Sequence, residues 1–250
     1  MSASKAVGEV VRQRVIVFGG NGFVGRRISQ VALSKGYEVV VACRSGAITV
    51  GGGAWTKNVI CESIDATDRS AVYDFLDEYS HDGNTKAVVS SIGLLTRDHI
   101  QARRINGDPT LNIAAALYEK KMPSLNRMVF VSAADLQPAN KFLHGYYHGK
   151  RSAEKAMRTF LPQSKIAILR PGMIYGSRPL ENGFSVPLGL IGAPLEMINR
   201  PLQSVIPLSI LTPPVSVDTL AQAAVYSCGE EGENGTFEYK DICRLAKRLM

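Results

Sequence analysis

A run of glycines between a short apolar segment and a helical pattern is the feature that most restricts how this chain can fold. Residues 14–18 read RVIVF, and Gly19, Gly22 and Gly25 follow at once within GGNGFVG. Glycine permits a tight turn at the first position, phosphate approach at the second and close helix packing at the third. The next helix N-terminus supplies N–H groups and a positive dipole. The pattern therefore predicts a strand, turn and helix that grip a pyrophosphate.

Strand and helix patterns alternate along the rest of the chain. This alternation predicts a Rossmann fold, an α/β, doubly wound parallel sheet whose ligand crevice lies at the carboxyl ends of the strands. β-branched runs predict strands at 14–18, 38–43, 59–64, 87–90, 128–132 and 165–170. Apolar residues at helical spacing predict helices at 22–35, 68–79, 108–121 and 146–160.

The length of 250 residues favours a single domain with enough core to need no disulfide or metal. We expect residues 1–13 to be an N-terminal tail or presequence remnant and residues 14–175 to form the NAD(P)-binding core. Residues 176–250 are expected to form a small C-terminal substrate or lid and docking region. The apolar stretch 184–214 is interrupted by prolines and charges, so no transmembrane segment is expected, and it is interpreted as either a lid or a docking surface.

Charge and cysteine content restrict the partners. The formal net charge is +7, but the basic residues are scattered and accompany no nucleic-acid module, so no nucleic-acid partner is expected. The positive charge remains compatible with a phosphate-bearing ligand, with an anionic membrane, or with an organelle whose proteins are generally basic. The four cysteines have neither CxxC spacing nor a histidine cluster, so we expect no metal and a reducing compartment.

The end of the second predicted strand distinguishes between the two nicotinamide coenzymes. An NAD site usually has a carboxylate there to accept hydrogen bonds from the ribose. This strand ends with Arg44, whose guanidinium can pair with a 2′-phosphate, so NADP(H) is preferred over NAD(H). Asp65 follows the third strand and is placed to contact the adenine, although a turn residue there is equally ordinary.

A tyrosine and a lysine one helical turn apart form the candidate catalytic pair. Tyr146 and Lys150 are spaced i, i+4, which places both on one helix face after the fifth strand. The nearby ammonium is expected to lower the pKa of Tyr146 and to make it a better proton donor and acceptor near neutral pH. Ser132, at the end of the strand, is expected to hydrogen-bond a substrate carbonyl.

These motifs resemble the short-chain dehydrogenase/reductase superfamily in its extended or atypical branch. The resemblance covers about residues 15–224 and rests on GGNGFVG, SSIG, INGDPTLNIAAA, FVSAAD, YYHGK and LRPGMIYG. It implies that Tyr146 is the acid/base, Lys150 holds the nicotinamide ribose, Ser132 orients the carbonyl and Asn106 supports a proton-relay water. The implied cofactor-binding residues are Gly19, Gly22, Phe23, Val24, Gly25, Arg44, Asp65, Ser91, Ile92, Gly93, Lys150, Pro171 and Gly172.

Within that superfamily the chain looks most like mitochondrial and plastid NAD(P)-binding proteins. These are similar to the accessory protein of ubiquinone biosynthesis and to the nucleotide-binding accessory subunit of respiratory complex I. The likeness implies a mitochondrial location, on the matrix side and peripheral to the inner membrane, in preference to a plastid. Few residues follow Tyr175, so the larger substrate domain of sugar-nucleotide enzymes is not expected.

Three functions remain open. The first is an NADP(H)-dependent oxidoreductase acting on a carbonyl or alcohol, with a hydrophobic small-molecule substrate or quinone-related ligand from prenylquinone (ubiquinone) metabolism. The second is a nucleotide-holding accessory or assembly subunit of a mitochondrial inner-membrane complex, either respiratory complex I or the ubiquinone-synthesis complex, without turnover. The third is a regulatory sensor of the NADPH/NADP ratio.

Overall fold

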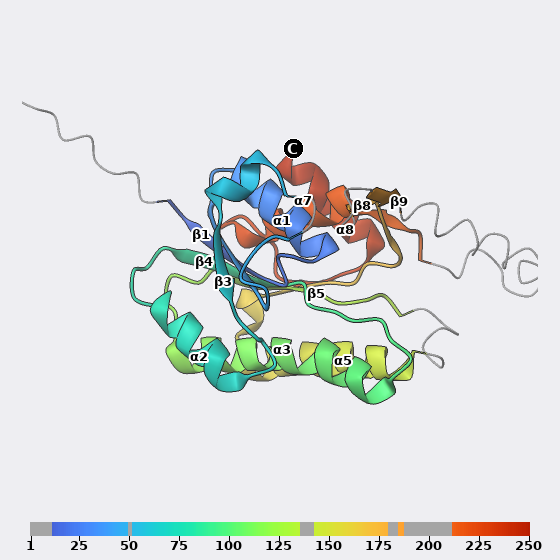
Figure 1. The fold of residues 1–250 in the computed structure, drawn as a ribbon, viewed down its shortest axis with the longest axis horizontal. Helices are drawn as coiled ribbons and strands as arrows, with labels where there is room; N and C mark the ends of the chain where they lie inside the picture. The colour runs from blue at the N-terminus through green and yellow to red at the C-terminus, as the bar shows by residue number, and fades with distance from the viewer. Residues whose placement is uncertain (1–11, 50–51, 136–142, 180–184, 188–211) are drawn as a thin grey trace, which may run out of the picture.

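The computed structural model describes residues 12–49, 52–135, 143–179, 185–187 and 212–250, and all structural statements below concern these residues (Figure 1). Seven parallel strands form the central sheet in the order β11-β6-β5-β4-β1-β2-β3. The order reverses direction between β1 and β4, which is where a doubly wound sheet opens a crevice for a ligand. The strands are β1 (Arg14–Phe18), β2 (Glu38–Cys43), β3 (Ile60–Ser63), β4 (Thr85–Ser90), β5 (Arg127–Val131), β6 (Ile166–Leu169) and β11 (Gly235–Phe237).

Helices cover both faces of this sheet, as Figure 1 shows, and confirm the predicted doubly wound α/β fold. One layer contains α1 (Phe23–Ser34), α7 (Val217–Cys228) and α8 (Tyr239–Leu249). The other contains α2 (Arg69–Glu78), α3 (His99–Lys120) and α5 (His144–Phe160). Shorter elements are the 3₁₀ turns η1 (Ala54–Asn58) and η2 (Gln163–Lys165) and the two-stranded pairs β7 (Ile174–Tyr175) with β10 (Val215–Ser216) and β8 (Ser177–Pro179) with β9 (Ser185–Pro187).

The strands are buried on both faces because successive side chains alternate between two cores. Val15 and Val17 of β1 belong to the core under α1, α7 and α8. Ile16 and Phe18 belong to the core under α2, α3 and α5. This two-sided burial explains why the strands appear in the sequence as continuous apolar runs and not as alternating ones.

Helix α3 differs most from its prediction. It begins at His99, nine residues before the predicted start, and contains Pro109 within it. Asp98 caps it by accepting hydrogen bonds from the backbone N–H groups of Ile100 and Gln101. The segment Asn106–Pro109 suggests a turn in the sequence, but tertiary packing overrides that local preference.

Glycines of α5 allow this packing by bringing the two helix backbones together. A Cβ on Gly149 would lie 2.6 Å from the carbonyl oxygen of Arg103, and one on Gly145 would overlap the carbonyl of His99. The close approach holds the N-terminal halves of α3 and α5 side by side at the carboxyl edge of the sheet, because each helix directly follows the carboxyl end of β4 or β5. That edge is where the predicted catalytic residues lie.

The C-terminal part of the chain contributes to the same sheet. β11 pairs with β6, and α7 packs against α1 and α8. The interpretation of 184–214 as a lid or docking surface falls mostly on residues outside the described ranges. Among the described residues, no helix is long and apolar enough to cross a membrane.

Candidate functional site

The glycine loop forms a cradle at the N-terminus of α1. Gly19 has a φ of +79°, and its carbonyl oxygen accepts a hydrogen bond of 2.9 Å from the N–H of Gly22. A Cβ on Gly25 would overlap that same carbonyl and lie 2.5 Å from the Oγ of Ser91, so the helix can pack here only on glycine. Gly22 caps α1 without a side-chain hydrogen bond, and the first turn, which begins with Phe23 and Val24, has no acidic residue. The turn is thus open to an anion, and its geometry fits a pyrophosphate.

The loop after β4 connects the glycine loop to the candidate catalytic lysine. Ser91 donates from its Oγ to the carbonyl of Phe18 at 2.9 Å. The carbonyl of Ile92 accepts a 2.9 Å hydrogen bond from the Nζ of Lys150. A Cβ on Gly93 would lie 3.3 Å from that Nζ and 3.1 Å from the Oδ1 of Asn106. The structure therefore places the predicted cofactor-binding residues Ser91, Ile92 and Gly93 in the loop that contacts Lys150.

Lys150 is buried beside Tyr146. Its Nζ donates to the carbonyls of Ile92 and Val131, both at 2.9 Å, and lies 5.9 Å from the centroid of the Tyr146 ring. Burial lowers the pKa of Lys150 to about 7, against a raising effect of Glu154. At neutral pH this lysine therefore holds its proton less firmly than an exposed lysine does.

The expectation that Tyr146 has a lowered pKa is wrong for this molecule. Burial raises the pKa of Tyr146 to about 12, the neighbouring Tyr147 raises it further, and Arg151 only partly opposes this. The Nζ of Lys150 is directed at two backbone carbonyls and not at the Tyr146 hydroxyl. Desolvation of the phenolate is thus the largest effect, and Tyr146 is a protonated phenol at neutral pH.

Lys150→Met is expected to change how stability depends on pH. Lys150 binds fewer protons when folded than when unfolded, since its pKa of about 7 lies below the ordinary 10.5. Stability of the wild type therefore rises as pH increases from about 7 to about 10.5, by up to about 1.4 kcal/mol per pH unit. Below pH 7 the destabilisation caused by burying a protonated Lys150 has its full value. Urea unfolding between pH 7 and 10 should show this slope in the wild type and a smaller one in Lys150→Met. Equal slopes in the two proteins would contradict a buried Lys150 with a lowered pKa.

Ser132 and Asn106 lie at the site, but protein groups occupy their side chains. The Oγ of buried Ser132 donates to the Oε1 of Glu154 at 2.6 Å. The Nδ2 of Asn106 donates to the carbonyls of Leu94 and Ala102, both at 2.7 Å, and its Oδ1 accepts from the N–H of Leu94 at 3.2 Å. In this state both side chains hold the surrounding loops in place.

Sequence reasoning missed a buried ionic network behind Ser132. The Glu154 carboxylate accepts a 2.6 Å hydrogen bond from Arg151 and bonds of 2.9 and 2.5 Å from the Nε and Nη2 of Arg170. Burial alone would raise the pKa of Glu154, but hydrogen bonds from Arg170 and Ser132 and the charges of both arginines hold it below its usual value. The spacing of Glu154 one turn after Lys150 was the available signal.

This network also supports the segment that follows β6. Arg170 donates through its Nη1 to Glu238 at 3.2 Å and through its backbone N–H to the carbonyl of Phe237 at 2.8 Å. The next residue, Pro171, accepts a hydrogen bond of 2.8 Å from the N–H of Ala134. A Cβ on Gly172 would lie 3.1 Å from the carbonyl of Thr212. The predicted residues Pro171 and Gly172 are thus fixed against the loop after β5 and against Thr212.

At the other end of the crevice, Arg44 and Asp65 follow β2 and β3, and both are exposed. The sequence analysis did not single out Asn21 of the glycine loop, which donates to the hydroxyls of Ser45 at 3.2 Å and Thr49 at 3.1 Å. The Oδ1 of Asn21 also accepts from the N–H of Thr49 at 3.0 Å. These bonds hold the segment that carries Arg44 against the glycine loop.

A hollow of about 600 Å³ borders α5 on a different side. At 100° per residue, the helical residues that line it project away from the face that carries Tyr146 and Lys150, and neither of these two lines it. Its lining combines charged, polar and aromatic side chains. No cluster of potential metal ligands occurs among the described residues. The residues lining the hollow are Asp135, His144, Tyr147, His148, Arg151, Ser152 and Lys155.

A protein-family model described as the NAD dependent epimerase/dehydratase family matches residues 15–191. The chain belongs to this family. A chloroplastic protein of Arabidopsis thaliana, itself described as uncharacterized, is 36% identical over 253 residues that cover 97% of this chain and 80% of the relative. MIOREX complex component 2 of Saccharomyces cerevisiae is 31% identical over 108 residues, which are 42% of this chain and 37% of the yeast protein.

Solved structures show the same fold as this family member at low sequence identity. WbmG of Bordetella bronchiseptica in complex with NAD has a TM-score of 0.63 and 15% identity, covering 97% of this chain and 79% of WbmG. A UDP-glucose 4-epimerase of Thermotoga maritima with UDP-glucose has a TM-score of 0.62 and 17% identity, with 94% and 82% covered. A short-chain dehydrogenase of Streptomyces avermitilis has a TM-score of 0.62 and 14% identity, with 96% and 93% covered.

Proposed function

We propose that the protein is an NADP(H)-dependent oxidoreductase that reduces a carbonyl or oxidises an alcohol. The observation that carries this proposal is the position of Lys150, which is buried between the carbonyls of Ile92 and Val131 with Tyr146 beside it. The carbonyl of Ile92 lies in the loop after β4 and that of Val131 at the end of β5, and the loop after β4 also contacts the glycine loop. A coenzyme that spans the crevice would therefore reach the tyrosine.

The residues divide between the two ends of such a coenzyme. The glycine loop and the first turn of α1 would hold the pyrophosphate, Arg44 the 2′-phosphate and Asp65 the adenine. Lys150, Ser91, Ile92 and Gly93 would surround the nicotinamide half, with Pro171 and Gly172 beside it. When bound, the nicotinamide supplies or accepts a hydride at the reacting carbon of the substrate.

Tyr146 handles the proton in this proposal. With a pKa raised to about 12 it carries its proton at neutral pH, so it can donate directly to a carbonyl oxygen during reduction. In the direction of oxidation the phenol must first lose that proton. Ser132 could orient the carbonyl only if its hydroxyl leaves Glu154, so we assign proton donation to Tyr146 alone.

We also propose an organellar location, which the chloroplastic relative supports without choosing between plastid and mitochondrion. Quinone-ring carbonyls are the substrate class to test first, because the sequence resembles proteins connected with prenylquinones. The test is to titrate the purified protein with NADPH and NADH by coenzyme fluorescence, and then to measure turnover with quinone precursors and simple carbonyls. We expect tighter binding of NADPH; absence of affinity for both coenzymes would overturn the proposal.

A nucleotide-holding accessory subunit is the second candidate. The observations that favour it are the side chains of Ser132 and Asn106, which are held by protein groups and not directed at a reactant. A relative that is a component of a complex also supports it. Stable co-purification with an inner-membrane complex, together with coenzyme binding but no turnover, would favour this function over the enzyme.

A further inference from the structure

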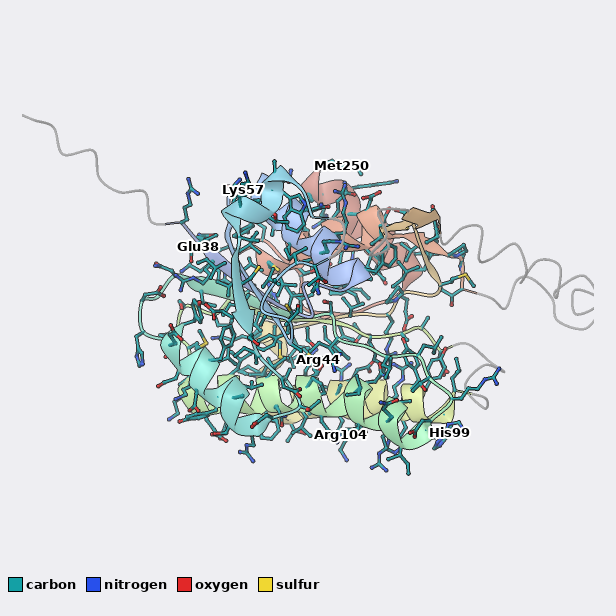
Figure 2. All side chains as sticks on the ribbon, viewed as in Figure 1. Glu38, Arg44, Lys57, His99, Arg104 and Met250 are labelled. Atoms are coloured by element: carbon teal, nitrogen blue, oxygen red, sulfur yellow. The ribbon has the colours of Figure 1, made fainter. Side chains whose placement is uncertain are left out.

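Two exposed arginines flank the loop after β3. Arg44 directly follows β2, and Arg104 lies near the start of α3. Figure 2 shows Arg44 beside the sheet and Arg104 on the helix layer below it. The charges of both arginines act on Asp65 in this loop. Hydrogen bonds from Thr67 lower the pKa of the Asp65 carboxyl, and the charges of Arg44 and Arg104 lower it further.

Contacts of α3 fix the position of Arg104. Two i+4 steps after Arg104 on the same side of the helix, Asn112 donates from its Nδ2 to the carbonyls of Ala66 at 3.1 Å and Thr67 at 3.2 Å. This side of α3 therefore borders the loop after β3. Arg104 lies two turns nearer the N-terminus, which is the end closest to the carboxyl edge of the sheet because α3 follows β4. Arg104 is thus held at the same edge as Asp65.

Arg44 reaches this edge through the glycine loop. Asn21 binds Ser45 and Thr49 and so ties the segment that begins with Arg44 to the loop that would hold a pyrophosphate. The pyrophosphate cradle and the segment that begins with Arg44 are consequently held together. A ligand group bound between the arginines would belong to the same molecule as the pyrophosphate.

Neither guanidinium has a hydrogen bond or an ion pair within 4.0 Å to any part of the chain that the structure describes. Two cations with one carboxylate leave an excess of positive charge, and the planar fork of a guanidinium matches a phosphate. We infer that Arg104 and Arg44 together bind the 2′-phosphate of NADP(H), with Arg104 as a second determinant of coenzyme choice. The inference rests on the proposed function and adds a residue from a separate element to it.

The test compares Arg104→Gln with Arg103→Gln, a matched control. Arg103 is the adjacent exposed arginine of α3, has the same charge, and is not among the groups that act on Asp65. Full-length protein is titrated with NADPH, NADH, 2′,5′-ADP and 5′-ADP. In Arg104→Gln we expect binding of NADPH and 2′,5′-ADP to weaken on the order of tenfold, with NADH and 5′-ADP unchanged. Arg103→Gln should bind all four like the wild type.

Each other result has a distinct meaning. Unchanged NADPH binding in Arg104→Gln, with a loss in Arg44→Gln, would overturn the role of Arg104 but keep the proposed function. Equal weakening of all four ligands would also overturn it, since Arg104 would then serve the shared ADP part. If Arg103→Gln weakened NADPH binding as much as Arg104→Gln does, the loss would come from the lower net positive charge, and the specific role of Arg104 would be overturned. A wild type that binds neither coenzyme would overturn the proposed function itself.

Discussion

Tyr146→Phe is expected to lower turnover by about 10²- to 10⁴-fold, the usual contribution of a positioned proton donor. The phenylalanine keeps the ring that packs edge-on against Tyr147 at 5.3 Å and near the Nζ of Lys150 at 5.9 Å. Only the hydroxyl is removed, so coenzyme affinity and unfolding temperature should remain close to those of the wild type. Steady-state kinetics and coenzyme titration of the same preparation measure both.

Tyr147→Phe is the matched control for this prediction. Tyr147 is the neighbouring buried phenol, but it lines the hollow on the outer side of α5. Its hydroxyl should therefore contribute little to turnover. Full activity of Tyr146→Phe would refute the acid/base role, and equal losses in the two variants would indicate a general effect on the helix.

Glu154→Gln is expected to lower the free energy of unfolding by about 3 kcal/mol at pH 7, because removal of one partner from a buried ion pair leaves its counterions uncompensated. Glu154 is only 4% exposed and is contacted by Arg151, Arg170 and Ser132. The amide can accept some of these hydrogen bonds but supplies no charge. Urea unfolding monitored by circular dichroism measures the difference.

The difference in stability between the wild type and Glu154→Gln is also expected to depend on pH. The pKa of Glu154 is lowered in the folded state from its ordinary 4.5, so the carboxylate stabilises the protein fully above that value. This stabilisation is lost as pH falls through the lowered pKa that Glu154 has in the folded state. The unfolding free energies of the wild type and Glu154→Gln should therefore converge in acid. Glu233→Gln is the control, since Glu233 pairs with Arg244 and Arg248 at the surface and should cost less than about 1 kcal/mol. A cost for Glu154→Gln as small as that of the control would contradict the buried network.

Local patterns predicted the elements but not all of their ends. The strand, glycine turn and helix of residues 14–34 are confirmed because β-branched residues, backbone freedom and helical spacing are properties of adjacent residues. The start of α3 was predicted nine residues too late, in a region where Gly107 opposes a helix locally. In the structure Gly107 packs closely against Gly149, which lies far along the chain.

The candidate site divides in the same way. Tyr146 and Lys150 could be paired from their spacing, and Ser91, Ile92 and Gly93 could be assigned to the coenzyme only through the family resemblance. The direction of the Tyr146 pKa shift could not, since it depends on burial by several elements. The hydrogen bond of Ser132 to Glu154 and the effect of the Arg104 charge on the pKa of Asp65 also join residues that no local pattern relates.

The sequence by itself determined that this chain forms a doubly wound sheet with a glycine turn between its first strand and first helix, because these features follow from periodicity and from glycine at set positions. Only the tertiary structure decided which polar side chains are free to meet a ligand and which are already bound to the protein. Hydrogen bonding and desolvation depend on neighbours in space, and folding brings those neighbours from α3, α5 and β6 to one edge of the sheet.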